Sequence, residues 1–136
     1  MKYKHKVAYM KSAFNFAECS NATRLQVGAI LVNDGGIIAE GYNGLPLGMS
    51  GSCEDGSGNT LKEVIHAEDN ALRKVTRKSI SSVGSIMFCT HSPCLQCAIK
   101  LVDAGVKEVY YAIDYRNRDG VEWLMKNEVI VNKLEV

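Results

Sequence analysis

The sequence predicts an α/β fold, a three-layer α/β/α sandwich in which helices cover both faces of a mixed sheet of about five strands. Three observations predict it, and the first two are an antiparallel hairpin signal early in the chain and a later alternation of helix-like and strand-like segments. The third is the length of 136 residues, which suffices for one substantial core and not for two. We therefore expect a single domain over residues 1–136.

The first half of the chain predicts one helix, one hairpin and a long loop. Apolar residues recur at helical spacing over about residues 3–19, which indicates an amphipathic helix. Two β-rich segments, 27–33 and 36–42, flank the turn signal Asn33-Asp-Gly-Gly36 and indicate an antiparallel hairpin. Residues 43–60 are rich in glycine and serine without periodicity, so they form either an ordered binding loop or a floppy insertion.

The second half predicts helices and strands in alternation. One strand-like segment is apolar without alternation, which is typical of a strand buried on both faces. Proline suits the first turn of the helix that follows it, and a glycine ends that helix. The expected elements are a helix over 61–77, a strand over 85–90, a helix over 94–104, a strand over 106–113, a helix over 120–126 and an edge strand over 129–131.

Composition excludes several classes of protein. Sixteen basic and fifteen acidic residues give a net charge of +1, which argues against a protein that grips long nucleic acid through its phosphates. No apolar run approaches the roughly 18 residues of a membrane span, and the basic N-terminal segment is not followed by a signal-peptide core. Five cysteines without a disulfide-like framework indicate thiols and metal ligands in a reducing cytosol.

One imidazole and two thiols form a candidate metal site. His66, Cys94 and Cys97 offer three protein ligands for Zn²⁺ and leave the fourth tetrahedral position to water, as in catalytic zinc sites. The two cysteines are three residues apart on one helical face, and helix N-termini near His66 and Cys94 would favour the thiolates that zinc requires. Glu68 lies two residues beyond His66 and is the candidate general acid and base that would move the proton of a zinc-activated water.

Two other interpretations of this cysteine pair stay open at this point. A structural zinc would need a fourth ligand, which Cys89 or His91 could supply. The two cysteines could also form a redox-active C-x-x-C pair, but this interpretation leaves the distant His-x-Glu segment without a role.

The motifs around these residues resemble a known family. The pattern H-x-E…P-C-x-x-C is the signature of zinc-dependent nucleobase deaminases. The chain resembles the cytidine deaminase superfamily and, within it, the deoxycytidylate (dCMP) deaminases, over nearly its whole length. The segments that carry the resemblance are Arg24-Leu-Gln-Val-Gly-Ala-Ile-Leu-Val32, Gly41-Tyr-Asn-Gly-Leu-Pro46 with Gly48, His66-Ala-Glu-Asp-Asn-Ala-Leu72 and Ser92-Pro-Cys-Leu-Gln-Cys97.

The resemblance implies a cytidine deaminase-like fold and the hydrolysis of dCMP to dUMP and ammonia, which supplies dUMP for thymidylate synthesis. It implies one catalytic Zn²⁺ on His66, Cys94 and Cys97, with Glu68 as the proton shuttle. It also implies a cytoplasmic enzyme, in a bacterial cytosol or in that of a phage-infected host.

The resemblance further suggests which residues bind the substrate. Asn43 would hold the deoxyribose, although an Asn-Gly pair is also an ordinary turn. The backbone around Ala67 and Ser92 would read the pyrimidine edge. For the 5′-phosphate the candidates are Arg24 and Asn70, with Tyr115 as a sugar or phosphate contact. Each of these residues also has an ordinary structural interpretation. Arg24 could be a solvated surface charge, Asn70 could cap or decorate its helix, and Tyr115 could serve packing.

Regulation and assembly also follow only from the resemblance. Members of the family are often hexamers that dCTP activates and dTTP inhibits, through the glycine-rich loop after Tyr42, and Mg²⁺ could accompany an allosteric dCTP. Some members carry a second, structural zinc, for which Cys19 and Cys53 would be candidate ligands. The residues before His66 include no histidine to complete that set, so we do not expect a second zinc.

Three further functions stay open from the sequence. A tRNA adenosine or polynucleotide cytosine deaminase would share the chemistry but would need a basic groove, which the near-zero net charge does not favour. A deaminase of free cytidine would differ only in substrate. A nucleotide-sensing or zinc-stabilised binding module would have no use for Glu68 beside the metal.

Overall fold

The computed structural model describes residues 1–115 and 117–136. Its five strands form one sheet in the order β2-β1-β3-β4-β5. Strand β1 pairs antiparallel with β2 and β3, whereas β3, β4 and β5 run parallel, so the sheet is mixed. The elements are α1 (Tyr3–Ala17), β1 (Gly28–Asn33), β2 (Gly36–Tyr42), α2 (Ala67–Arg77), β3 (Ile86–His91), α3 (Leu95–Asp103), β4 (Glu108–Ile113), α4 (Asp119–Lys126) and β5 (Ile130–Lys133).

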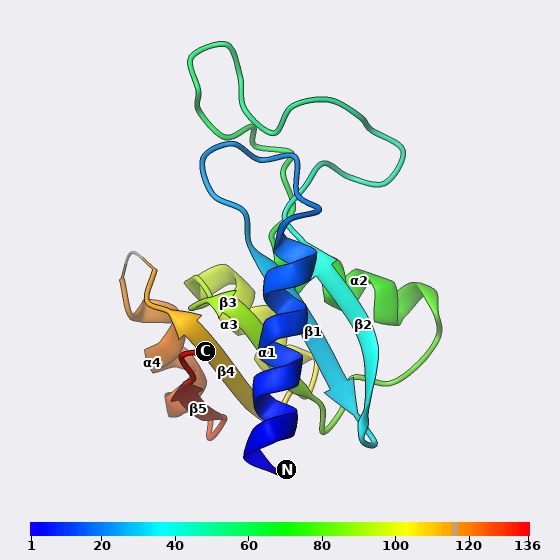
Figure 1. Cartoon of the computed structure of the whole chain (residues 1–136), viewed down its shortest axis with the longest axis vertical. Coiled ribbons are helices and arrows are strands. Elements are labelled where there is room, and N and C mark those ends of the chain that lie inside the picture. Colours follow the sequence, from blue (N-terminus) through cyan, green and yellow to red (C-terminus); the bar gives the residue numbers. More distant parts are fainter. Residues whose placement is uncertain (116) are drawn as a thin grey trace.

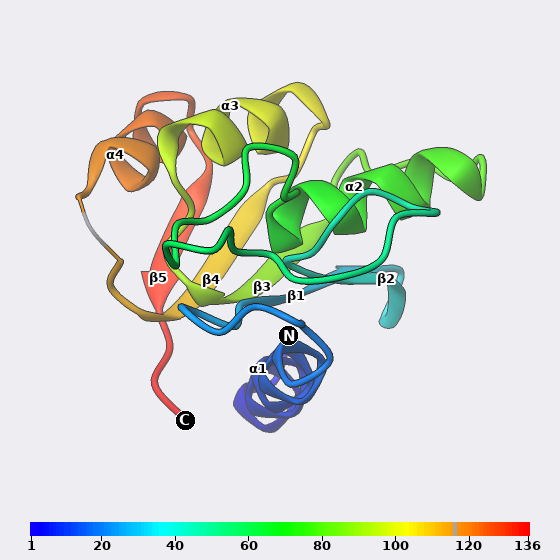
Figure 2. The ribbon, with the colours of Figure 1, turned by 90° about the horizontal axis from the view of Figure 1, so that it is seen from above.

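Helices cover both faces of this sheet. Figure 1 shows α1 lying across one face, and Figure 2 shows α2, α3 and α4 together on the opposite face. The predicted three-layer α/β/α sandwich is therefore confirmed. None of the helices in the described part of the chain has the length and apolarity needed to cross a membrane.

Two apolar clusters hold the layers together, one on each face of the sheet. Because side chains alternate along a strand, Ile30 and Phe88 pack against α1, while Leu31 and Met87 face the other three helices. All four side chains are completely buried. The ring of Phe88 stacks on that of Tyr110 with their centroids 5.1 Å apart, which joins β3 to β4 beneath α1.

The hairpin between β1 and β2 forms where the sequence predicts it. Asn33 pairs with Gly36, and the two residues between them adopt positive φ angles of 50° and 76°. This left-handed turn matches the twist of the flanking strands. A register shift after Leu31 leaves one extra residue in β2, which is a β-bulge.

The structure corrects one boundary that matters for the site. The helix expected from residue 61 begins only at Ala67. Ile65 instead pairs with Gly44, through N–H···O bonds of 2.8 and 3.1 Å in the two directions. This bridge holds residues 61–65 outside the helix, because a backbone group paired with a neighbouring segment cannot join the helical ladder.

The segment between Gly44 and Ile65 is an ordered loop, which decides between the two alternatives left open by the sequence. The carboxylate of Asp55 accepts the backbone N–H groups of Ser57 and Asn59 at 2.8 and 3.0 Å. Glu54 and Thr60 form a further isolated bridge. Figure 1 shows this loop projecting from the end of the sheet at which β1 begins and β2 ends.

Candidate active site

His66 and Cys94 each stand immediately before a helix on the same face of the sheet. His66 has extended backbone (φ −70°, ψ 156°) and precedes α2, and Cys94 has the same conformation (φ −71°, ψ 168°) before α3. The Sγ of Cys94 caps α3 by accepting the backbone N–H of Cys97 at 3.5 Å. Two helix N-termini therefore present their first side chains to one point.

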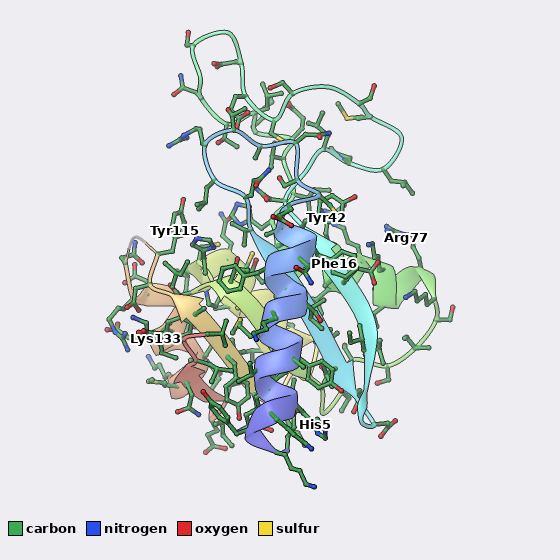
Figure 3. All side chains as sticks on the ribbon, in the orientation of Figure 1. His5, Phe16, Tyr42, Arg77, Tyr115 and Lys133 are labelled. Atoms are coloured by element: carbon green, nitrogen blue, oxygen red, sulfur yellow. The ribbon has the colours of Figure 1, made fainter. Side chains whose placement is uncertain are left out.

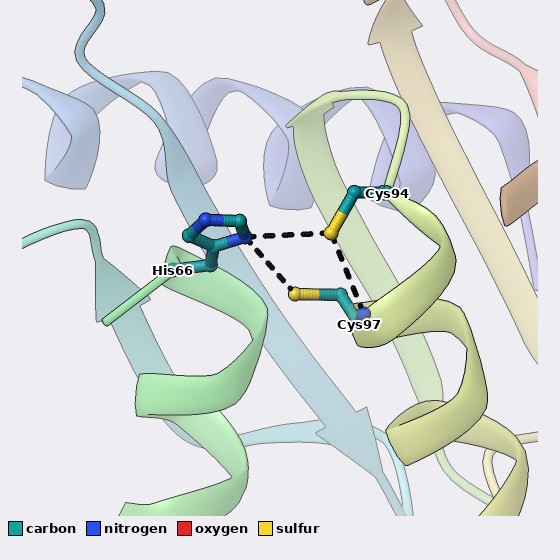
Figure 4. A group of neighbouring side chains, drawn as sticks. All are labelled: His66, Cys94 and Cys97. Atoms are coloured by element: carbon teal, nitrogen blue, oxygen red, sulfur yellow. Dashed lines mark hydrogen bonds between the residues drawn. The ribbon is translucent and has the colours of Figure 1, made fainter. Parts of the chain in front are cut away.

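The three predicted ligands meet there. The Nδ1 atom of His66 lies 3.5 Å from the Sγ of Cys94 and 3.4 Å from the Sγ of Cys97 (Figure 4). The three donor atoms lie within 4.8 Å of one another. Atoms about 2.0–2.3 Å from a tetrahedral ion would be separated by distances of this order.

The electrostatics of the two thiols favour a cation. Hydrogen bonds from Cys97 and from His66 lower the pKa of the Cys94 thiol to about 4. The hydrogen bond with Cys94, together with burial, raises the pKa of the Cys97 thiol. The hydrogen bond between His66 and Cys94 also raises the pKa of the His66 imidazole. A divalent cation would displace the protons of this cluster.

The donor set fits Zn²⁺ with an open position. Among the described residues, His66, Cys94 and Cys97 are the group that can converge on a metal, and no fourth side chain joins them. The Sγ of Cys89 is buried and donates to the carbonyl of Tyr110 at 3.5 Å. The Nδ1 of His91 is 2.8 Å from the hydroxyl of Thr90. The two candidates for a fourth ligand are therefore engaged elsewhere, which argues against a closed structural zinc site.

Glu68 lies in the first turn of α2, beside the ligand set. Its side chain is only 4% exposed. Burial raises the pKa of its carboxyl group to about 7, which exceeds the opposing effects of its own backbone N–H and of His66. A carboxyl group with a pKa near neutrality can both accept and donate a proton at physiological pH.

A cavity of about 650 Å³ opens beside these groups. This volume lies within the range of small-molecule sites. Of the ten residues predicted from the sequence, all but Cys97 and Asn70 line it. Figure 3 shows Tyr115 and Tyr42 at the same end of the molecule, the end from which the loop projects. The cavity therefore lies where the sheet, two helix N-termini and the loop meet.

Asn43 fixes the wall of this cavity. Its Oδ1 accepts the N–H of Val27 at 2.9 Å, and its Nδ2 donates to the carbonyl of Leu25 at 2.8 Å. One amide hydrogen and one lone pair remain on the side chain for a ligand. Asn43 thus joins the segment before β1 to the segment after β2.

Ser92 fixes another part of the wall. Its hydroxyl accepts the backbone N–H of Tyr115 at 2.8 Å, and its own N–H donates to the carbonyl of Ile113 at 2.9 Å. The end of β4 is therefore held against the turn that leads into α3. Ala67 is fully buried at the start of α2.

Arg24 and Asn70 differ in where they lie. Arg24 is exposed at the cavity rim, and its guanidinium donates to the hydroxyl of Thr60 at 3.3 Å. Asn70 does not line the cavity; its Nδ2 donates to the carbonyl of Tyr42 at 2.8 Å. This bond ties α2 to the end of β2, from which the loop departs.

Glu54 and His91 are among the lining residues that were not predicted as substrate-site residues. Glu54 comes from the loop, and its carboxylate accepts the backbone N–H groups of Thr23 and Arg24 at 3.1 and 3.3 Å. Burial raises the pKa of this carboxyl group, but the hydrogen bonds from Arg24 and Thr23 outweigh it, so the pKa lies below its usual value. His91 was considered only as a fourth metal ligand. The position of His91 at the carboxyl end of a buried strand was the available signal, whereas nothing in the sequence marked Glu54.

Comparisons with known proteins agree with this geometry. The family model for the cytidine and deoxycytidylate deaminase zinc-binding region matches residues 3–113. The structure superposes with a TM-score of 0.95 on the dCMP deaminase of cyanophage S-TIM5, solved in complex with dCMP and dUMP; the two are 47% identical over 98% of this chain and 99% of that one.

Two curated relatives are more distant. ComE operon protein 2 of Bacillus subtilis is 33% identical over 94% of this chain and 70% of its own length. The deoxycytidylate deaminase of Saccharomyces cerevisiae is 33% identical over 88% of this chain, which spans only 41% of the yeast protein.

Proposed function

Because the chain belongs to the cytidine and deoxycytidylate deaminase family, we propose that it hydrolyses dCMP to dUMP and ammonia with one Zn²⁺. The observation that carries the proposal is that metal ligands and the candidate proton shuttle line the same cavity. His66, Glu68 and Cys94 line this cavity together, and its volume of about 650 Å³ suits a mononucleotide. The dCMP deaminase of cyanophage S-TIM5, of the same fold and length, was solved with dCMP and dUMP.

Three side chains would hold the ion. His66 would bind it through Nδ1, and Cys94 and Cys97 through Sγ, since these atoms converge and the helix N-termini favour thiolates. When bound there, Zn²⁺ lowers the pKa of water in its open position towards 7 and so supplies the nucleophile.

Glu68 would move the protons. The reaction joins the oxygen of water to C4 of cytosine and breaks the bond between C4 and the exocyclic nitrogen. Glu68 would take one proton from the attacking water and deliver it to N3 of the ring. It would then pass the second proton of that water to the amino group, which leaves as ammonia. Its burial and its pKa of about 7 support both directions of transfer.

The remaining lining residues would orient the nucleotide. The backbone at Ala67 and Ser92 would bind the pyrimidine edge, and the unused amide hydrogen of Asn43 would reach the deoxyribose. Arg24 would meet the 5′-phosphate, because it is an exposed cation at the rim of the cavity. Tyr115 would contact the sugar or the phosphate.

Asn70 has a different role in the proposal. Its amide binds the carbonyl of Tyr42, so it would hold the loop bearing Asn43 against α2 instead of contacting phosphate. This replaces the phosphate contact expected from the sequence.

The test is ammonia release from four candidate substrates. The zinc-loaded protein is incubated with dCMP, CMP, deoxycytidine and dCTP, and the initial rates are compared at equal concentration. We expect dCMP to give the highest kcat/KM. A higher value for deoxycytidine would contradict the nucleotide assignment but keep the reaction, and no release from any of the four would overturn both.

We also propose a setting for the enzyme: a homo-oligomer, most simply a hexamer, in the cytosol, regulated by dCTP with Mg²⁺ and by dTTP. The loop offers a surface for such contacts. Leu47 is 83% exposed and Met49 53% exposed, and apolar side chains on a projecting loop are typical of surfaces that another chain covers. Light scattering with and without each nucleotide tests assembly, and rates at low dCMP test regulation.

A further inference from the structure

Thr90 and His91 form a hydrogen-bonded pair at the end of β3. The hydroxyl oxygen of Thr90 is 2.8 Å from the Nδ1 of His91. The same oxygen accepts the backbone N–H of Gly28, at the start of β1, at 3.1 Å. Thr90 is completely buried, so no water reaches its hydroxyl group.

The direction of the bond to His91 follows from these contacts. A hydroxyl group has one hydrogen to donate, and the oxygen of Thr90 already accepts from Gly28. Among the described residues, the Nδ1 of His91 is the acceptor available to that hydrogen. A buried hydroxyl hydrogen without an acceptor is unfavourable, so Thr90 donates to Nδ1. A neutral His91 must then carry its hydrogen on Nε2.

The other edge of the imidazole lies at the cavity. His91 is partly buried, lines the cavity, and meets the ring of Tyr115 edge-on with their centroids 6.1 Å apart. Burial lowers the pKa of His91, which favours the neutral ring. Within the described part of the chain, no hydrogen bond joins Nε2 to another residue. The Nε2–H group is therefore a donor held in one orientation and available to a ligand.

We propose that His91 donates its Nε2–H to an oxygen of the bound nucleotide and that Thr90 selects the tautomer that makes this possible. The inference rests on the proposed function, because the acceptor is an oxygen of dCMP or dUMP. It assigns His91 to substrate specificity and Thr90 to positioning. Oxygens of the phosphate, the sugar and the pyrimidine carbonyl can all accept this hydrogen bond. The test below therefore distinguishes the phosphate from the sugar and the base.

Nitrogen-15 NMR of the zinc-loaded protein tests the tautomer. The chain has three histidines, and a His91→Phe variant identifies the signal of His91. We expect proton coupling at Nε2 and none at Nδ1, in wild type and in Thr90→Ser, which keeps the hydroxyl group. In Thr90→Val we expect a mixture of tautomers. A hydrogen on Nδ1 in the wild type would overturn the assignment.

Titration with ligands that do not turn over tests the donor. We expect dUMP to shift the Nε2–H signal of His91. A shift with inorganic phosphate alone would identify the 5′-phosphate as the acceptor, and a shift with deoxyuridine alone would identify the sugar or base. No shift with dUMP, in a protein that releases ammonia from dCMP, would overturn the inference and leave the proposed function intact. Absence of ammonia release would overturn the proposed function itself.

Kinetics provide a second measurement. His91→Phe keeps a ring beside Tyr115 but removes the donor, so we expect KM for dCMP to rise about tenfold with little change in kcat. His91→Gln places an amide N–H near the former Nε2 and should restore most of the affinity. If His91 only fills space, Phe would be tolerated at least as well as Gln, and that order would overturn the proposal.

Discussion

The carboxylate of Glu54 accepts the backbone N–H of Arg24 at 3.3 Å, although the two residues are 30 positions apart in the chain. The same oxygen also accepts the N–H of Thr23 at 3.1 Å. One side chain of the loop therefore fixes the backbone from which Arg24 reaches the cavity rim. Since Arg24 is proposed to meet the phosphate, the loop contributes to nucleotide binding without contacting the reacting atoms.

Replacing Glu54 by Ala should therefore weaken binding more than chemistry. The two N–H groups lose their acceptor, and the segment bearing Arg24 becomes more mobile. We expect KM for dCMP to rise roughly three- to tenfold and kcat to fall less than about twofold. Glu63→Ala removes an exposed carboxylate of the same loop and is the matched control. A kcat effect larger than the KM effect would contradict this positioning role.

Replacing Glu68 by Gln should remove turnover and keep the metal. The amide has nearly the same shape but cannot take a proton from water, so we expect kcat to fall by a factor of roughly 10² to 10⁴. Zinc should remain near one per chain by elemental analysis, because Glu68 is outside the converging donor set. Cys97→Ser is the complementary variant and should lose zinc. Turnover by Glu68→Gln at wild-type rate would exclude the proposed proton shuttle.

Much of the site is predictable because it is local. The spacing of Cys94 and Cys97 places both sulfurs on one turn, whatever the rest of the chain does. Both sulfurs lie near His66, as expected. The alternation of helices and strands supported this expectation, because helices that follow strands in such a fold begin at the same edge of the sheet.

The features that the sequence did not predict depend on the path of the loop between Gly44 and Ile65. Nothing in the sequence distinguishes Glu54 from a solvated carboxylate, because its partners are backbone groups brought near by the fold. The start of α2 was wrong for the same reason: helical spacing before His66 is overridden by the pairing of Ile65 with Gly44. The roles of Arg24 and Tyr115 towards a nucleotide stay predictions.

An ion pair links the two helices that carry the ligands, and it gives a pH-dependent prediction. Asp69 on α2 binds Lys100 on α3 at 2.8 Å and Arg73 at 3.3 Å. Burial raises the pKa of Asp69, but the hydrogen bonds with Lys100 and Arg73 outweigh it, so the pKa lies below 3.8. A carboxyl group with a lowered pKa stabilises the fold above its unfolded pKa, and that stabilisation is lost as pH falls through the folded value.

Asp69→Asn should therefore lower the free energy of unfolding at pH 7 by about 0.5–1 kcal/mol, since Lys100 is half exposed and solvent screens the pair. The difference from wild type should shrink as the pH is lowered below 3.8 and towards the folded pKa. Urea unfolding at several pH values measures this. Asp103→Asn, an exposed carboxylate on α3, should have almost no effect at pH 7. A difference that grows on acidification would contradict the sign.

The close approach of β2 to α2 gives the last prediction. A Cβ at Gly41 would collide with the carbonyl oxygen of Ala67 and lie 2.7 Å from the N of Ala71. Both contacts are with helix backbone, which cannot move aside as a flexible side chain can. In Gly41→Ala the N-terminus of α2 must shift, and it carries His66 and Glu68. The geometry of the metal site therefore depends on Gly41, because any larger residue at this position of β2 would displace the start of α2.

We expect Gly41→Ala to lower the free energy of unfolding by about 1–3 kcal/mol and also to weaken zinc retention against a chelator. Gly36→Ala is the matched control, because Gly36 is in the same strand and a Cβ there meets nothing within 4 Å. If both variants kept zinc equally well, the strand would not set the position of His66. If Gly41→Ala lost zinc at unchanged stability, the displacement would be confined to the first turn of α2, where the ligand and the proton shuttle lie side by side.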